Sequence, residues 1–117
     1  MQMHEITYGQ AMPVESYGPG FFRVAGDVIR GPMLATGKRA VSWGGLDDVD
    51  ALLALAADVD VLFLGMGPEM AFAPKDMQSA LEAAGIGVEA MATPAACRTY
   101  NITLSEGRRV ALAVLPV

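Results

Sequence analysis

Side chains that could do chemistry are concentrated in residues 85–109, in a chain that is otherwise rich in alanine and leucine. Arg98, Asn101 and Ser105 recur three and four residues apart, so a helix would place them in one polar stripe. Near a helix start, with its free backbone donors, Arg98 could bind an anion or a carboxylate of a partner. The plainer interpretation of the stripe is a solvated face or an ion pair with Glu89.

Glu89 and Cys97 are the other reactive groups of this stretch. Glu89 lies in a predicted strand that otherwise looks buried, and a buried carboxylate needs a partner or a shifted pKa. A structural ion pair is favoured over a proton-handling or ligand-binding role. Cys97 lacks a nearby histidine as base and would share an apolar helix face with Tyr100, which favours a buried core thiol over a nucleophile. The candidate partners of Glu89 are Arg98, Arg108 and Arg109.

A glycine turn follows directly after an apolar run and consists of Gly65, Met66 and Gly67, with Pro68 after it. It resembles part of a dinucleotide-binding fingerprint. That fingerprint needs a third glycine and a helix that begins at once. Met70 stands in place of the third glycine, and a loop precedes the next helix. We therefore predict a tight turn at the carboxyl end of a strand, where it could still form one wall of a pocket.

Composition limits the classes of function. The net charge is −5, and no Lys or Arg occurs between positions 40 and 74, so the sequence gives no electrostatic indication of nucleic-acid or anionic-lipid binding. One cysteine excludes an intramolecular disulfide, and together with the single histidine, His4, it excludes most closed zinc sites, which need several Cys or His ligands. His4 itself is expected to be a solvated terminal residue. No metal and no cofactor is predicted.

The sequence carries neither a secretory signal pattern nor an apolar run long enough to span a membrane. The N-terminal residues 1–5 lack the basic segment and apolar run that secretion requires. We therefore expect a protein that is not embedded in a membrane and that lies in the reducing cytoplasm.

Elements that would position these groups follow from the spacing of apolar residues. Gly and Pro punctuate the first 45 residues between short apolar runs, which predicts β-hairpins, with Trp43 as a core or inter-layer side chain. Beyond Gly45, helices are predicted at 46–56 and 74–84, with Pro74 in the first position of the second. Strands are predicted at 61–64, 87–91 and 110–115, the last buried on both faces.

Residues 94–106 fit two patterns. Tyr100, Ile102 and Leu104 alternate with polar residues as in a strand, whereas Cys97, Tyr100 and Leu104 also share one helical face. Thr93 as N-cap, Pro94 as first residue and a stop at Gly107 slightly favour the helix. The C-terminal half is then a βαβαβ unit with parallel strands and right-handed crossovers, and the N-terminal hairpins pack on that sheet or extend it.

Three segments carry a family resemblance: GIGVEAMAT at 85–93, AACRTYN at 95–101 and SEGRRV at 105–110. They resemble the signature of a small uncharacterised-domain family that includes a mitochondrial complex I (NADH:ubiquinone oxidoreductase) assembly factor and the adipogenesis-associated domain protein. YGPGFFRVAG at 17–26, Trp43, LGMG at 64–67 and ALAVLP at 111–116 extend the likeness over nearly the whole chain. Two positions depart from the family pattern: Ala92 replaces a usual acidic residue, and Met66 replaces a common Thr.

The resemblance implies a single-domain, three-layer α/β fold over residues 1–117 and favours the helix at 94–106. It implies no established enzymatic activity, and it links the mitochondrial relative to the assembly of a membrane respiratory complex through protein contacts.

We therefore expect a soluble, non-enzymatic binding or assembly domain that could assist assembly of a respiratory or other membrane complex. Its contact surface would comprise the glycine turn and the start of the 94–106 helix, with Arg98 as the polar anchor. The alternative is a binder of an anionic metabolite, or an enzyme, that uses the same crevice with Glu89 as proton acceptor. A third possibility is a homodimer that uses this surface. The predicted site residues are Gly65, Met66, Gly67, Glu89, Arg98 and Asn101.

Overall fold

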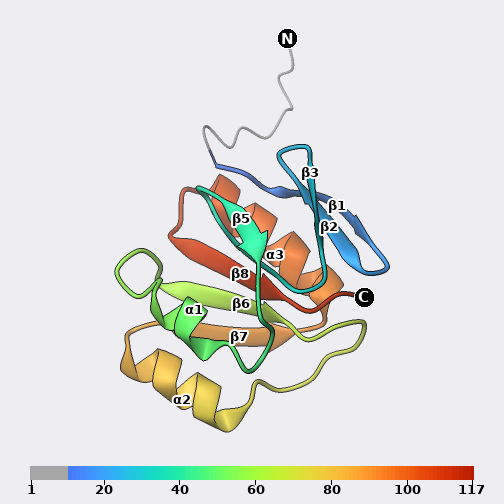
Figure 1. The fold of residues 1–117 in the computed structure, drawn as a ribbon. Coiled ribbons are helices and arrows are strands. Elements are labelled where there is room, and N and C mark those ends of the chain that lie inside the picture. The colour runs from blue at the N-terminus through green and yellow to red at the C-terminus, as the bar shows by residue number, and fades with distance from the viewer. Residues whose placement is uncertain (1–10) are drawn as a thin grey trace.

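The computed structural model describes residues 11–117, which form eight strands and three helices (Figure 1). His4 lies outside the described residues. Five strands form a central sheet in the order β5-β4-β8-β6-β7. Their bounds are β4 Met33–Thr36, β5 Ala40–Ser42, β6 Val61–Gly65, β7 Gly87–Met91 and β8 Val110–Val114.

The predicted βαβαβ unit is confirmed: β6 pairs in parallel with β7 on one side and with β8 on the other. Both predicted placements of the N-terminal hairpins also occur. The β4–β5 hairpin extends the sheet by pairing antiparallel with β8. The remaining N-terminal strands form a separate antiparallel sheet, β1 Val14–Gly18, β2 Phe21–Val24 and β3 Asp27–Arg30.

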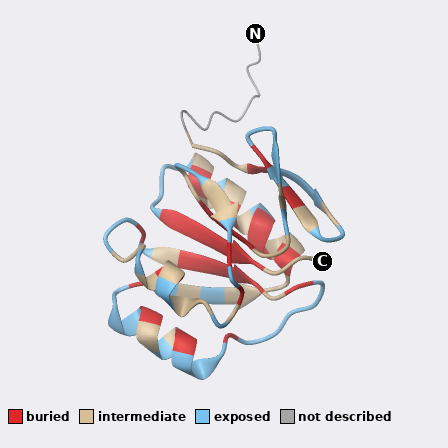
Figure 2. Ribbon diagram, in the orientation of Figure 1, coloured by how far each residue is buried: buried red, intermediate tan, exposed pale blue. Residues whose placement is uncertain are grey.

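The molecule has three layers, as predicted. One face of the central sheet is covered by α3 (Thr93–Ser105) and the three-stranded sheet, and the other face by α1 (Val49–Leu53) and α2 (Lys75–Ala83). Side chains of β8 alternate between the two cores, so Leu112 packs beside α3 while Ala113 packs beside the other helices. Figure 2 shows the buried residues running along β6 and β8, the inner strands of the parallel unit.

The predicted helices are present, but their first and last residues differ from the prediction. The first helix is shorter than 46–56, because the chain leaves the helix after Leu53 and continues in turns. Pro74 is the N-cap of α2, not its first residue. The predicted helix at 94–106 is confirmed as α3, which ends at Ser105 with Glu106 as C-cap. Thr93 is the first residue of α3 and Ala92 its N-cap, without a side-chain capping bond.

Both α2 and α3 end next to the glycines that were predicted to stop them. Gly85 and Gly107 have positive φ angles of 89° and 80°, and each directly follows a helix C-cap. After α3 the N–H of Gly107 donates to Leu104 and that of Arg108 to Thr103, the paired bonds of a Schellman motif. This αL ending explains why the segment stops as a helix before β8 begins.

Candidate functional site

The glycine turn after β6 is hydrogen-bonded to the start of α3. Thr93 is 0% exposed, and its hydroxyl accepts a hydrogen bond from the Gly67 N–H at 2.9 Å and donates to the Leu115 carbonyl at 2.7 Å. The Thr93 N–H donates to the Gly67 carbonyl at 2.8 Å. The polar groups at the centre of this turn are therefore used within the fold.

Gly65 is required by close packing. A Cβ atom there would lie 2.6 Å from Cγ1 of Val114 and 2.8 Å from Oγ1 of Thr93. Gly67 has a φ of 102°, in the left-handed region that favours glycine. Two glycines that resembled a ligand-binding fingerprint therefore shape the junction between β6 and α3, and Met66 between them is half-buried.

The loop that continues from this turn to α2 exposes two large apolar side chains. Met70 is 57% exposed and Phe72 is 84% exposed. Because β6 and β7 are parallel, this loop and the start of α3 leave the same end of the sheet, as Figure 1 shows. The sequence pattern does not predict that these two side chains are exposed. The one available signal was that Met70 and Phe72 lie between Pro68 and Pro74 and belong to no helical or strand pattern of apolar residues.

Arg98 and Asn101 are brought together on α3, but their roles differ. The Asn101 side chain accepts a hydrogen bond from the Val14 N–H at 2.8 Å and donates to the Val14 carbonyl at 2.9 Å. The amide thus pairs with the edge of β1 as a neighbouring strand would, and it holds the three-stranded sheet against the helix.

Arg98 is exposed and makes no salt bridge with any residue in the range 11–117. It lines a groove of about 320 Å³ between β1 and α3, together with Tyr17, Asn101 and Ile102. Neither the 65–68 turn nor Glu89 lines this groove. Within the described part of the chain, Arg98 is therefore free to meet a carboxylate or another anion.

Glu89 is exposed, and the expected burial of its strand was wrong at this position. The physical reason is the strand order: β7 is one of the two edge strands of the sheet, and α3 lies mainly over β6 and β8. Glu89 makes no ion pair with the residues that the structure describes; of its candidate partners, Arg109 instead pairs with Asp60 at 3.2 Å.

Cys97 and Tyr100 point into the core, as predicted. Burial raises the pKa of the Cys97 thiol to about 12, so the reactive thiolate is disfavoured at neutral pH. Burial also raises the pKa of Tyr100, whose hydroxyl has no hydrogen-bond partner among the described residues. These surroundings suit packing and not nucleophilic chemistry.

Over residues 11–117, no three His, Cys, Asp or Glu side chains come together as a metal site. No helix in the same range is long and apolar enough to cross a membrane.

Residues 14–115 match the family described as "Protein of unknown function (DUF498/DUF598)". The chain belongs to this family. An uncharacterized protein of Rhodobacter capsulatus is 50% identical to this DUF498/DUF598 chain, over all of the chain and 94% of the relative. The human NADH dehydrogenase [ubiquinone] 1 alpha subcomplex assembly factor 3 is 28% identical over 92% of the chain, which spans 62% of that relative's length.

Solved structures share the fold. A Bordetella pertussis protein described as a Mth938-like domain superposes with a TM-score of 0.80 at 27% identity, over 99% of this chain and 92% of the other. An outer membrane protein from Bartonella henselae gives a TM-score of 0.82 at 30% identity, over 93% and 97%. The DUF498/DUF598 chain therefore has the Mth938-like fold and is distantly related to a complex I assembly factor.

Proposed function

We propose that this DUF498/DUF598 chain is a non-enzymatic protein-binding domain that assists assembly of a larger complex. The observation that carries the proposal is Phe72, which is 84% exposed beside the exposed Met70 in the loop after β6. An exposed aromatic side chain with an apolar neighbour resembles the anchors that dominate the energy of protein interfaces.

Arg98 is the charged side chain that this proposal assigns to the partner contact. The loop begins at the turn that is bonded to the start of α3, and Arg98 lies on the second turn of that helix. A partner that fits would have an apolar pocket for Phe72 and a carboxylate for Arg98. The distant relationship to a complex I assembly factor supports the class of function, but the relative is longer than this chain.

A photo-crosslinking amino acid at position 72, used in host cells, tests the proposal. The matched control is position 28, since Val28 is also an exposed apolar residue but lies on β3. We expect a discrete crosslinked protein at position 72 and none at position 28.

The crosslinked protein is then purified and its affinity measured directly. Phe72→Ser should weaken binding at least about tenfold, Arg98→Glu should weaken it as well, and Val28→Ser should leave it unchanged. The proposal is wrong if position 72 gives no specific crosslink, or if Phe72→Ser and Val28→Ser bind equally well.

A homodimer that uses the same surface is the competing prediction. Sedimentation of the purified chain separates the two cases, because a dimer that Phe72→Ser dissociates would assign this surface to self-association. The cytoplasmic location is likewise a proposal, and fractionation of host cells tests it.

A further inference from the structure

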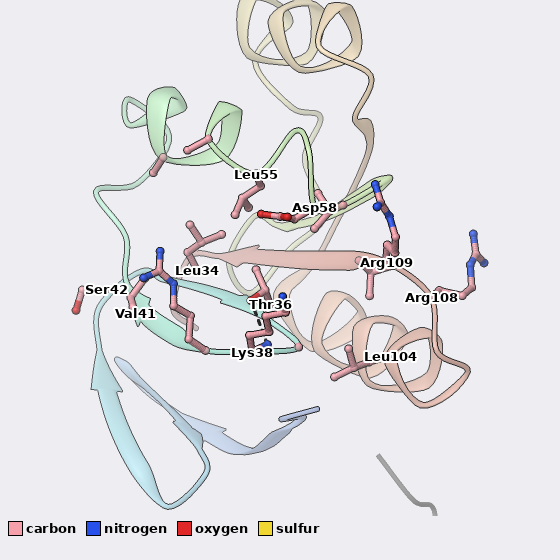
Figure 3. Close-up of a pocket in the computed structure, with 16 residues that line it drawn as sticks. Leu34, Thr36, Lys38, Val41, Ser42, Leu55, Asp58, Leu104, Arg108 and Arg109 are labelled. Carbon is pink, nitrogen blue, oxygen red and sulfur yellow. Dashed lines mark hydrogen bonds between the residues drawn. The ribbon is translucent and has the colours of Figure 1, made fainter. Parts of the chain in front are cut away.

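A cavity of about 670 Å³ lies at the end of the central sheet where the parallel strands begin (Figure 3). It is bounded by the β4–β5 hairpin, the end of α1 and the residues that lead into β8. It shares no lining residue with the groove that contains Arg98, and the loop with Phe72 does not reach it. An inference about this cavity therefore goes beyond the proposed function.

The inner wall of the cavity is apolar. Leu34 comes from β4, Val41 from β5, Leu55 from the turn after α1 and Val59 from the segment before β6. Leu34 and Val59 are buried, whereas Val41 and Leu55 remain half-buried at the cavity. Such a wall favours the apolar part of a ligand over water.

The rim of the cavity is cationic. Among residues 11–117, four of the eight Lys and Arg residues of the chain line it, against a single carboxylate, Asp58, in a protein of net charge −5. Figure 3 shows Lys38 on the hairpin and Asp58 beyond α1 on opposite sides of β8. The four cations are Lys38, Arg39, Arg108 and Arg109.

Strand pairing is what gathers these cations. Thr36 at the end of β4 pairs with Ala111 near the start of β8, so the 37–39 hairpin lies beside residues 108–110. Lys38 and Arg39 make no salt bridge within residues 11–117. Arg109 pairs with Asp60, but both side chains are more than half exposed, and such a pair contributes about 0–1 kcal/mol and exchanges readily.

We infer that this cavity binds a small amphiphilic anion, a molecule with an apolar chain that ends in a carboxylate or a phosphate group. The apolar chain would lie against Leu34 and Leu55, and the anionic group would meet Lys38 and Arg39 at the rim. A cavity of this volume lies within the range of about 300–1,000 Å³ that is typical of small-molecule sites. Several positive charges at one rim raise the local concentration of an anion.

Four probes separate the parts of this inference: octanoate, octyl phosphate, octanol and inorganic phosphate. Amide chemical shifts of the full chain are followed during each titration, below the concentration at which the probes form micelles. We expect saturable shifts at Leu34 and Val59 with octanoate or octyl phosphate, and at least about tenfold weaker binding of octanol. Inorganic phosphate should not saturate these shifts, and the better of the two amphiphiles identifies the preferred anionic group.

Matched charge reversals test the rim. Lys38→Glu combined with Arg39→Glu should weaken binding of the preferred probe at least about tenfold. Arg23→Glu combined with Arg30→Glu makes the same change in net charge at exposed sites on the three-stranded sheet and should change affinity less than about twofold.

Ala54→Phe tests the cavity itself. Ala54 is an exposed lining residue, so the larger side chain can occupy the cavity without entering the core, and it should abolish the shifts. The inference is overturned if octanol binds as well as octanoate, if the two charge reversals weaken binding equally, or if no probe shifts the lining amides.

Discussion

Replacing Thr93 by Val tests whether one buried hydroxyl holds the junction of β6, α3 and the segment after β8. Valine keeps the shape and the branching at Cβ but removes the hydroxyl. The substitution leaves the Gly67 N–H and the Leu115 carbonyl without the partner that the hydroxyl provides. A buried polar group that loses its partner costs about 1–3 kcal/mol, so the two together should lower the free energy of unfolding by about 2–6 kcal/mol.

A loss of this size is a large fraction of the roughly 5–15 kcal/mol that stabilises a typical domain. Urea unfolding followed by the fluorescence of Trp43, the single tryptophan and a buried one, measures it. Thr93→Ser keeps the hydroxyl and should cost about 1 kcal/mol, through the lost methyl group. Hydrogen exchange at the Gly67 amide should accelerate in the valine variant more than exchange at distant amides.

Thr103→Val is the matched control. The Thr103 hydroxyl donates only to carbonyls of its own helix, those of Thr99 and Tyr100, and it is half-buried. The control should change the free energy of unfolding by less than about 0.5 kcal/mol. If Thr93→Val is no more destabilising than Thr103→Val, the hydroxyl does not hold this junction and the reasoning is refuted.

Three further predictions concern packing and burial. Gly65→Ala should destabilise the fold by about 1–3 kcal/mol or more because its Cβ would meet Val114 at 2.6 Å, whereas Gly87→Ala, where the nearest atom is 3.7 Å away, should cost much less in the same urea assay. Tyr100→Phe should be neutral or stabilising in thermal unfolding, since the hydroxyl has no partner among the described residues; a clear loss would reveal a hydrogen bond. Burial raises the pKa of the Cys97 thiol from 9.0 to about 12, so as the pH rises the unfolded chain loses this proton before the folded chain does. The free energy of unfolding should therefore fall above pH 9, by up to about 1.4 kcal/mol per pH unit. Cys97→Ala should flatten that slope, and an unchanged slope would contradict the assignment.

The parallel unit could be predicted from the sequence because its patterns are local. The helical spacing in 74–84 and the apolar runs at 61–64 and 110–115 each report burial of one element. The segment 94–106 was harder because its apolar residues satisfy both periods. Its glycine stop at Gly107, where φ is 80°, agrees with the helix that forms.

The candidate site was less predictable because it depends on the order of strands in space. The sequence pattern predicts a buried Glu89, and the position of β7 at the sheet edge exposes it. The cations of the cavity are separated by most of the chain, and only the pairing of β4 with β8 brings them together. Phe72 lies in a loop whose residues follow no helical or strand period, so their spacing does not predict that its side chain is exposed.

The central position of β8 has a consequence for biosynthesis. Of the strands in the five-stranded sheet, β8 leaves the ribosome last, yet it joins the β4–β5 hairpin to the β6–β7 pair. The nascent chain therefore carries two half-sheets, each with an unpaired edge, until β8 has emerged. Completion of this fold must follow translation of β8, so a stalled or truncated chain would expose both edges to aggregation and to the quality-control machinery of the cell.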